Sequence, residues 1–212
     1  LNNWDFSHKG AMTLRTALVY SRNTTALQTF KAVGETNIKS FLNNLDIQIK
    51  NDGQDYLVES NSIGADISPI KMAAAYAAFG NYGTYSKPYT VTKVTTRDGQ
   101  VTEFKPEQKQ AMKDSTAYMI TDVLKDSFKY GFATQASIPG LPTAAKTGSS
   151  NYTVEQKRAM GASDYEDIIP DSWFIGYSTD YTISAWTGYD NPYEKGGGVD
   201  TTEQEYSRLI YY

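Results

Sequence analysis

The chain has 212 residues, of which 40% are hydrophobic and 13% aromatic, so it can form one well-buried domain or two small ones. Its 20 basic and 24 acidic residues give a formal net charge of −4, and no basic run could follow a phosphate backbone, so we expect no nucleic-acid partner. There is no cysteine and a single histidine, His8, which we expect on the surface. This excludes a cysteine nucleophile, a Cys/His zinc site and most histidine-dependent mechanisms, and we expect neither a cofactor nor a metal.

Membrane and export signals are also missing from this stretch. It has no apolar run of about 18 residues and no leader with a basic, apolar and small-residue order. We therefore expect that it neither spans a membrane nor carries its own export signal, although it could be a piece of a larger anchored protein.

Three short helices are predicted near the start of the chain. Apolar residues at helical spacing indicate helices over Met12–Tyr20, Thr25–Val33 and Thr36–Asn44, and Gly34 is a typical helix end. Residues 21–23, Ser-Arg-Asn, thus lie at the junction of the first two helices. Taken alone, Ser21 and Asn23 are best interpreted as local capping residues.

A serine and a lysine three positions apart follow an irregular polar stretch over residues 47–62. Ser68-Pro69-Ile70-Lys71 matches S-x-x-K, the pattern of a serine nucleophile with a lysine base. Serine followed by proline is also the expected start of a helix, which here leads into the apolar run Met72–Phe79. We therefore interpret Ser68 as an N-cap residue.

The middle of the chain predicts a hairpin and a long helix. Residues 85–104 have β-rich composition around an Asp98-Gly99 turn, which indicates a hairpin on the surface. A helix over Ala111–Phe128 follows, and we expect its apolar stripe to lie in the core. The stripe consists of Met112, Tyr118, Met119, Val123 and Leu124.

The stretch with the most binding chemistry is residues 143–152, which contain Lys146-Thr147-Gly148-Ser149. In an extended strand, Lys146 and Gly148 share one face, and Thr147 and Ser149 share the other. Without a Cβ at Gly148 a ligand backbone can lie against the strand, and the N–H of Ser149 can donate to it. The near-match to a nucleotide loop, G-x-x-x-x-A-K-T, is rejected because it has Ala145 in place of a glycine and contains Pro142.

The rest of the chain predicts more of a sheet. Residues 153–169 are expected to form a loop or short helix over a cleft, and 173–175 and 181–186 to be antiparallel strands, with the Lys146 strand beside the first. A glycine-rich link over residues 195–198 precedes a final helical segment over Thr201–Tyr212.

The two polar motifs together resemble a known family. Ser21-Arg22-Asn23, followed 125 positions later by Lys146-Thr147-Gly148-Ser149, resembles the S-x-N and K-T-G pair of the penicillin-recognising serine enzymes. The surrounding sequence is similar to the transpeptidase domain of bifunctional (class A) penicillin-binding proteins, particularly those of Gram-positive cocci, over essentially the whole chain. The similar segments are Leu14-Arg15-x-Ala17-Leu18-x-x-Ser21-x-Asn23, Met72–Phe79 and Trp186-Thr187-Gly188-Tyr189.

The resemblance implies an α/β fold of the α+β type, in which helices flank an antiparallel sheet beside a helical subdomain. We expect one partial transpeptidase domain over residues 1–212. Residues 1–142 would be mainly helical, with the hairpin excursion at about 85–104, and 143–212 would hold the C-terminal strands and terminal helix.

The resemblance also implies peptidoglycan D,D-transpeptidase activity by serine acyl transfer, with stem peptides and β-lactam antibiotics as ligands. Ser21 would relay a proton, held by Lys146, and Asn23 would bind a substrate amide. Thr147 and Ser149 hydroxyls would bind the substrate carboxylate, beside Gly148, and the Ser149 N–H would serve an oxyanion hole. The family places the enzyme on the outer face of the cell membrane, anchored by an upstream segment.

One departure from the family pattern matters most. The family's S-x-x-K nucleophile precedes S-x-N, but only 20 residues precede Ser21 here, so we expect the N-terminal remainder of the same protein to carry it. Ser149 also stands where the family usually has threonine. A serine β-lactamase is one alternative, but such an enzyme would be expected to have aspartate in place of Arg22. A non-catalytic β-lactam sensor or wall-assembly subunit is a further alternative.

Overall fold

A computed structural model describes residues 1–211 of the chain. Its α-helices are α1 (Leu14–Val19), α2 (Asn23–Val33), α3 (Glu35–Asn44), α4 (Pro69–Gly80), α5 (Asp114–Lys125), α6 (Val154–Ala159) and α7 (Tyr206–Tyr211). Its strands are β1 (Thr84–Ser86), β2 (Lys93–Thr95), β3 (Val101–Glu103), β4 (Gln108–Gln110), β5 (Ala144–Ser149), β6 (Asp171–Tyr177) and β7 (Thr182–Gly188). Short 3₁₀ turns cover Glu59–Ser62, Asp126–Phe128, Thr134–Ala136 and Glu203–Glu205.

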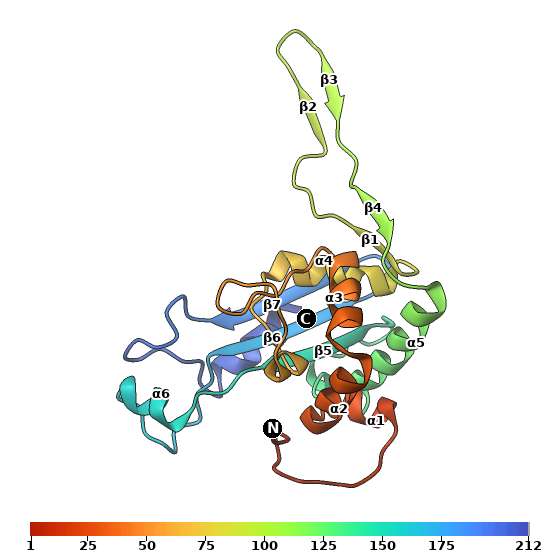
Figure 1. Cartoon of the computed structure of the whole chain (residues 1–212). Helices are drawn as coiled ribbons and strands as arrows, with labels where there is room; N and C mark the ends of the chain where they lie inside the picture. Colours follow the sequence, from red (N-terminus) through yellow and green to blue (C-terminus); the bar gives the residue numbers. More distant parts are fainter. Residues whose placement is uncertain (212) are drawn as a thin grey trace.

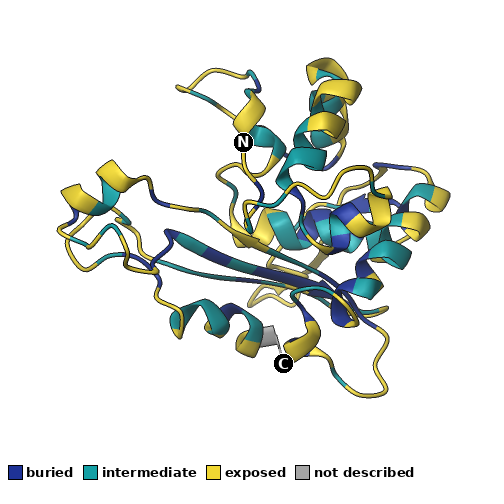
Figure 2. Cartoon of the chain, turned by 90° about the horizontal axis from the view of Figure 1, so that it is seen from below, coloured by how far each residue is buried: buried dark blue, intermediate teal, exposed yellow. Residues whose placement is uncertain are grey.

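The centre of the molecule is an antiparallel sheet with the order β5-β6-β7. Helices cover both of its faces, as Figure 2 shows from below. On one face, Ala144 and Tyr177 pack against residues of α1, α4 and α5. On the other face, Ala145 and Phe174 pack against the turns that follow α5, and Ser172 approaches Ser207 of α7. This arrangement confirms the predicted antiparallel sheet flanked by helices.

Strand β5 is an edge strand. It pairs with β6 on one side, and the described residues place no strand on its other side. Side chains of a strand alternate between its faces, so Lys146, two residues from Ala144, lies on the α4–α5 face, and Thr147 lies with Ala145 on the α7 face. The predicted division of Lys146 and Gly148 from Thr147 and Ser149 is thereby confirmed.

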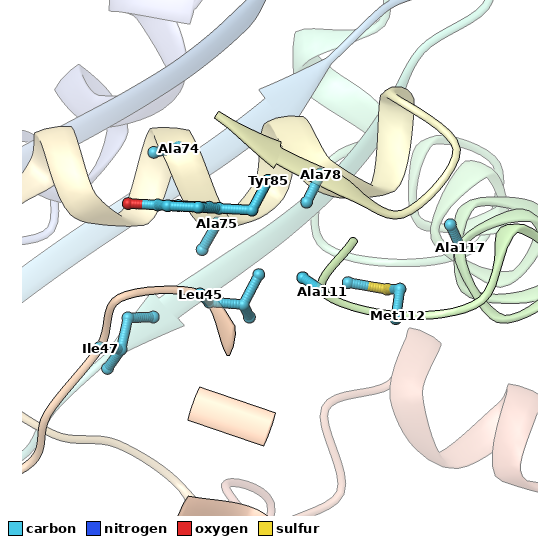
Figure 3. Packing of buried hydrophobic residues seen from close by; sticks show 9 residues of the cluster. All are labelled: Leu45, Ile47, Ala74, Ala75, Ala78, Tyr85, Ala111, Met112 and Ala117. Atoms are coloured by element: carbon cyan, nitrogen blue, oxygen red, sulfur yellow. The ribbon is translucent and has the colours of Figure 1, made fainter. Parts of the chain in front are cut away.

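A second core joins α4 to the base of the long hairpin. Figure 3 shows the Tyr85 ring lying along α4, with Leu45 and Ile47, from the segment that follows α3, below it. Tyr85 is 3% exposed and Ala78 is fully buried. The small side chains of α4 let the tyrosine ring approach the helix closely. The cluster consists of Leu45, Ile47, Ala74, Ala75, Ala78, Tyr85, Ala111, Met112 and Ala117.

The hairpin is longer than the sequence predicts. Strand β1 pairs with β4 at the base, and β2 pairs with β3 near the tip, so the hairpin extends over residues 84–110. Gly99 has a φ of 87° in the predicted turn, a conformation that glycine adopts without strain. Every residue of β2 and β3 is exposed, and Figure 1 shows this tip projecting from the body. The predicted surface excursion is confirmed.

The predicted core stripe of α5 is wrong in part. Leu124 is buried, and so is Met112, which lies before the start of the helix. Tyr118 is 73% and Met119 59% exposed. The buried face of the helix instead contains Ala117 and Leu124, seven residues apart, with the partly buried Ile120 between them. Large apolar residues occupy both faces here, so their presence alone does not identify the inward face.

Most other helix predictions differ from the structure only at their ends. Helix α2 begins at Asn23, two residues earlier than predicted, and α6 forms the short helix expected within residues 153–169. The final helix forms over Tyr206–Tyr211, and the predicted end at Tyr212 lies outside the described residues. No helix of the described part is long and apolar enough to cross a membrane.

Candidate active site

The S-R-N turn and the K-T-G-S strand come together in the folded chain. The Nζ of Lys146 donates a hydrogen bond of 2.8 Å to the Oγ of Ser21, although 125 residues separate them in sequence. Nζ also donates to the carbonyl oxygen of Thr147 at 2.8 Å. These two bonds fix the ammonium group at the free edge of β5.

Burial alters the proton affinity of this lysine. Lys146 is half-buried and has no carboxylate partner among the described residues. Loss of hydration lowers the pKa of Lys146 from 10.5 to about 8, because burial disfavours the charged form. A lysine with this pKa can hold or release a proton near neutral pH, and its neighbour Ser21 is the group to which it can pass one.

Ser21 occupies a strained backbone conformation. Its φ is 50°, in the left-handed region that residues other than glycine, asparagine and aspartate seldom enter. Helix α1 ends at Val19 and α2 begins at Asn23, so three residues connect the two helices. The N–H of Ser21 bonds back to the Leu18 carbonyl oxygen at the end of α1. The conformation places the Ser21 hydroxyl on Lys146 rather than on a helix end.

Asn23 is the first residue of α2, not its cap, because Arg22 occupies the N-cap position. The Asn23 Nδ2 donates to the carbonyl oxygen of Asn2 at 2.8 Å. The predicted capping role for Asn23 is therefore wrong. With Nδ2 held in this way, the Oδ1 of Asn23 remains without a partner among the described residues and can accept from a ligand.

Three further predicted site residues lie along the outer half of β5. Thr147 is half-buried, and Gly148 and Ser149 are exposed. A Cβ built on Gly148 would meet the Cβ of Trp173 at 3.4 Å, an ordinary contact, so the protein itself has room for a side chain at this position. Packing against the described residues therefore does not require glycine at this position.

The backbone of β5 offers hydrogen-bonding groups at its free edge. Ser150 donates its N–H to Asp171, at the start of β6. Alternate residues of an antiparallel strand direct their N–H and C=O groups to opposite sides, so Ser149 and Thr147 direct theirs away from β6. The Thr147 carbonyl oxygen accepts a hydrogen bond from Lys146 Nζ and not from β6, which agrees with this direction. An extended peptide could pair with this edge beside Lys146.

The second serine and lysine motif is built differently. Ser68 occupies the N-cap position of α4 with Pro69 as the first helical residue, as predicted, although its hydroxyl makes no capping bond. Ser68 and Lys71 are both exposed, and no hydrogen bond joins their side chains in the described part of the chain. The structure therefore does not bring this S-x-x-K pair into the site.

Arg22 is the residue whose importance the sequence reasoning missed. Its side chain is only 3% exposed and pairs with Asp5 at 2.9 Å. Its position between Ser21 and Asn23 was the available signal, but nothing in the sequence indicated Asp5 as its partner.

Comparison with known proteins identifies the family. Residues 1–205 match the penicillin binding protein transpeptidase domain. The chain belongs to this family. The chain is 42% identical over 217 aligned residues to penicillin-binding protein 1A of Streptococcus oralis, and the match covers 99% of this chain and 34% of that protein. It is 38% identical to penicillin-binding protein 1A/1B of Bacillus subtilis, covering 100% of this chain and 23% of that protein.

A solved structure supports the fold. The chain is similar to penicillin-binding protein 1A from Haemophilus influenzae with a TM-score of 0.78 and 18% sequence identity, covering 100% of this chain and 35% of the other. The chain spans about a third or less of the length of the curated relatives that it matches. The fold and the resemblance to class A penicillin-binding proteins predicted from the sequence are confirmed.

Proposed function

We propose that residues 1–212 form part of the active site of a peptidoglycan D,D-transpeptidase that β-lactams also acylate. The observation that carries this proposal is the 2.8 Å bond between Lys146 Nζ and Ser21 Oγ, which joins the two family motifs at an open strand edge. Family membership supports the reaction class, because this transpeptidase domain performs acyl transfer.

The nucleophile is proposed to be the serine of an S-x-x-K segment outside residues 1–212. The only S-x-x-K in this sequence is Ser68–Lys71, and both of its ends are exposed and unconnected to Lys146 by any described bond. This supports a nucleophile elsewhere in the protein.

In the proposed reaction, the nucleophile's Oγ bonds to the carbonyl carbon of the penultimate D-alanine of a stem peptide. Its hydroxyl proton passes to the lysine of the same S-x-x-K segment. The peptide C–N bond breaks, Ser21 passes a proton to the leaving nitrogen of terminal D-alanine, and the proton held by that lysine replaces the one that Ser21 gave. An amine of a second stem then attacks the acyl-enzyme, so a new C–N bond forms and the ester C–O bond breaks. The proton that the amine loses passes to the oxygen of the nucleophilic serine. The product is a cross-link.

The remaining roles follow from position. Lys146 holds Ser21 and stabilises nearby negative charge, and Asn23 contacts the substrate amide. The N–H of Ser149, directed away from β6, is one oxyanion-hole donor. The hydroxyls of Thr147 and Ser149 bind the substrate carboxylate, which would lie beside the edge on the α7 side of the strand. This chemistry takes place on the outer face of the cell membrane, where the peptidoglycan lies.

The test is to map the acylated residue. A protein that carries this chain together with an S-x-x-K segment is labelled with fluorescent penicillin, digested and analysed by mass spectrometry. We expect the adduct on the serine of that segment and on no residue of 1–212. An adduct on Ser68 would contradict the proposed nucleophile, and absence of any adduct would contradict β-lactam acylation.

A further inference from the structure

A buried arginine lies in the middle of the turn that carries Ser21. Arg22 Nη1 donates to Asp5 Oδ2 at 2.9 Å, and Nη2 donates to the carbonyl oxygen of Ser7 at 2.7 Å and to its Oγ at 3.1 Å. Asp5 in turn accepts from the Ser7 N–H at 3.0 Å and from the Ser7 hydroxyl at 2.7 Å. A guanidinium group is seldom buried unless it is paired, and here every one of these partners lies in residues 5–7.

The residues on both sides of Ser21 are bound to the same N-terminal segment. Trp4 Nε1 donates to the carbonyl oxygen of Tyr20 at 3.1 Å. On the other side, Thr24 donates its N–H to Asn3 Oδ1 at 3.2 Å, and Asn2 accepts from the Asn23 amide. We call residues 2–7 the N-terminal strap. The strap contacts residues 20, 22, 23 and 24. It does not bind the Ser21 hydroxyl, which accepts a hydrogen bond from Lys146.

The end of α1 and the strap restrain Ser21 in different ways. The end of α1 itself favours the left-handed conformation of Ser21. The Ser21 N–H donates to the Leu18 carbonyl oxygen at 3.1 Å, and the Arg22 N–H donates to the Ala17 carbonyl oxygen at 2.9 Å, as is common at the end of a helix. These bonds set the backbone of Ser21 but not the position of the whole turn relative to β5. The strap restrains that position, because it is bonded to the residues on both sides of Ser21. Asp5 and Arg22 make its charged bonds, and the hydrogen bond from the Arg22 guanidinium holds the pKa of Asp5 well below its usual range.

We propose that Asp5 and Arg22 are positioning residues that hold Ser21 Oγ against Lys146 for proton transfer. They act through Ser21 and do not touch the substrate. The inference rests on the proposed function, because it assigns a purpose to the position of Ser21. It adds a requirement that neither family motif contains, namely a carboxylate 16 residues before the S-R-N turn.

The test uses the isosteric substitution Asp5→Asn in a protein that carries this chain and an S-x-x-K segment. The first-order rate constant of acylation by fluorescent penicillin is measured at saturating penicillin, with and without Ser21→Ala. In the wild-type background we expect Asp5→Asn to lower this rate constant roughly 10- to 100-fold, as expected when a reacting group is misplaced by about 1 Å. In the Ser21→Ala background it should cause no further loss, because the group that it positions is absent.

Equal losses in the two backgrounds would overturn the proposal, since they would mean that Asp5 only stabilises the fold. The matched control is Asp122→Asn, which weakens the exposed pair between Asp122 and Arg15 and should leave acylation unchanged. If Asp5→Asn lowers the melting temperature enough to prevent the measurement, Ser7→Ala removes one Arg22 contact and should cause a smaller loss with the same dependence on Ser21. A Ser21→Ala protein that acylates at the wild-type rate would instead contradict the proposed role of Ser21, before Asp5 is changed.

Discussion

Two serine motifs lie next to helix starts in this chain, and they differ in what surrounds them. Ser21 lies at a strained turn, bonds to a lysine 125 residues away, and has a buried arginine as its neighbour. Ser68 lies in an ordinary extended N-cap conformation, exposed, with Lys71 one helical turn on and equally exposed. A motif whose residues meet a partner from a distant element can perform chemistry, whereas one that meets only its own helix has a local structural role.

The largest expected effect separates the two serines. In a protein that carries this chain and an S-x-x-K segment, Ser21→Ala should lower the rate of penicillin acylation roughly 10²- to 10⁴-fold, the usual contribution of a positioned proton-transfer group. Ser68→Ala removes the same hydroxyl group from a helix start and should leave the rate unchanged. The measurement is the time course of fluorescent penicillin labelling. Similar losses in the two variants would mean that Ser21 and Ser68 do not differ in function.

The two lysines should separate in the same way. Lys146→Ala should lower acylation by about 10²- to 10³-fold, because it removes a preorganised charge from the site. Lys71→Ala, at an exposed position without an ion pair in the described residues, should acylate normally. Far-ultraviolet circular dichroism of both variants checks that the fold survives. If both variants were impaired equally, the catalytic lysine would be wrongly assigned.

The sheet and the two motifs could be predicted from the sequence, for identifiable reasons. The strands near residues 173–175 and 181–186 are dense in β-branched and aromatic residues and separated by a short turn, so local preference and tertiary structure agree. The side-chain alternation that separates Lys146 from Thr147 follows from strand geometry alone.

What the sequence did not predict depends on contacts between distant residues. The inward face of α5 is set by the sheet it covers, so Tyr118 and Met119 turn outward despite their size. The bond from Asn23 to Asn2 and the pair of Asp5 with Arg22 join segments that have no shared local pattern. The meeting of Ser21 and Lys146 was expected only from family resemblance, and no periodicity indicated it.

A smaller effect is expected at Thr147, whose hydroxyl we propose binds the substrate carboxylate. Thr147→Val keeps the β-branched shape and the strand preference, so any loss must come from the hydroxyl. A hydrogen bond to a charged group contributes roughly 1.5 to 3 kcal/mol, and acylation efficiency toward a carboxylate-bearing β-lactam should fall correspondingly. Toward an analogue with an esterified carboxylate the effect should shrink toward zero. Equal losses with both compounds would mean that Thr147 shapes the strand and does not bind the carboxylate.

The last expected effect concerns pH, and it tests whether Lys146 acts in its charged form. Because the folded-state pKa is about 8 and the ordinary value is 10.5, the unfolded chain binds more protons between these two pH values. Stability should therefore rise with pH across this window in the wild type relative to Lys146→Met, by up to about 3 kcal/mol at one pKa unit per 1.36 kcal/mol. Acylation should change in the opposite direction and fall about tenfold for each pH unit above 8, since the ammonium form holds Ser21 and stabilises negative charge. Denaturant melts and acylation rates of the wild type and Lys146→Met, measured from pH 7 to 10, follow both changes. Acylation that rose with pH together with stability would instead mean that the neutral amine is the active form and that Lys146 accepts the proton.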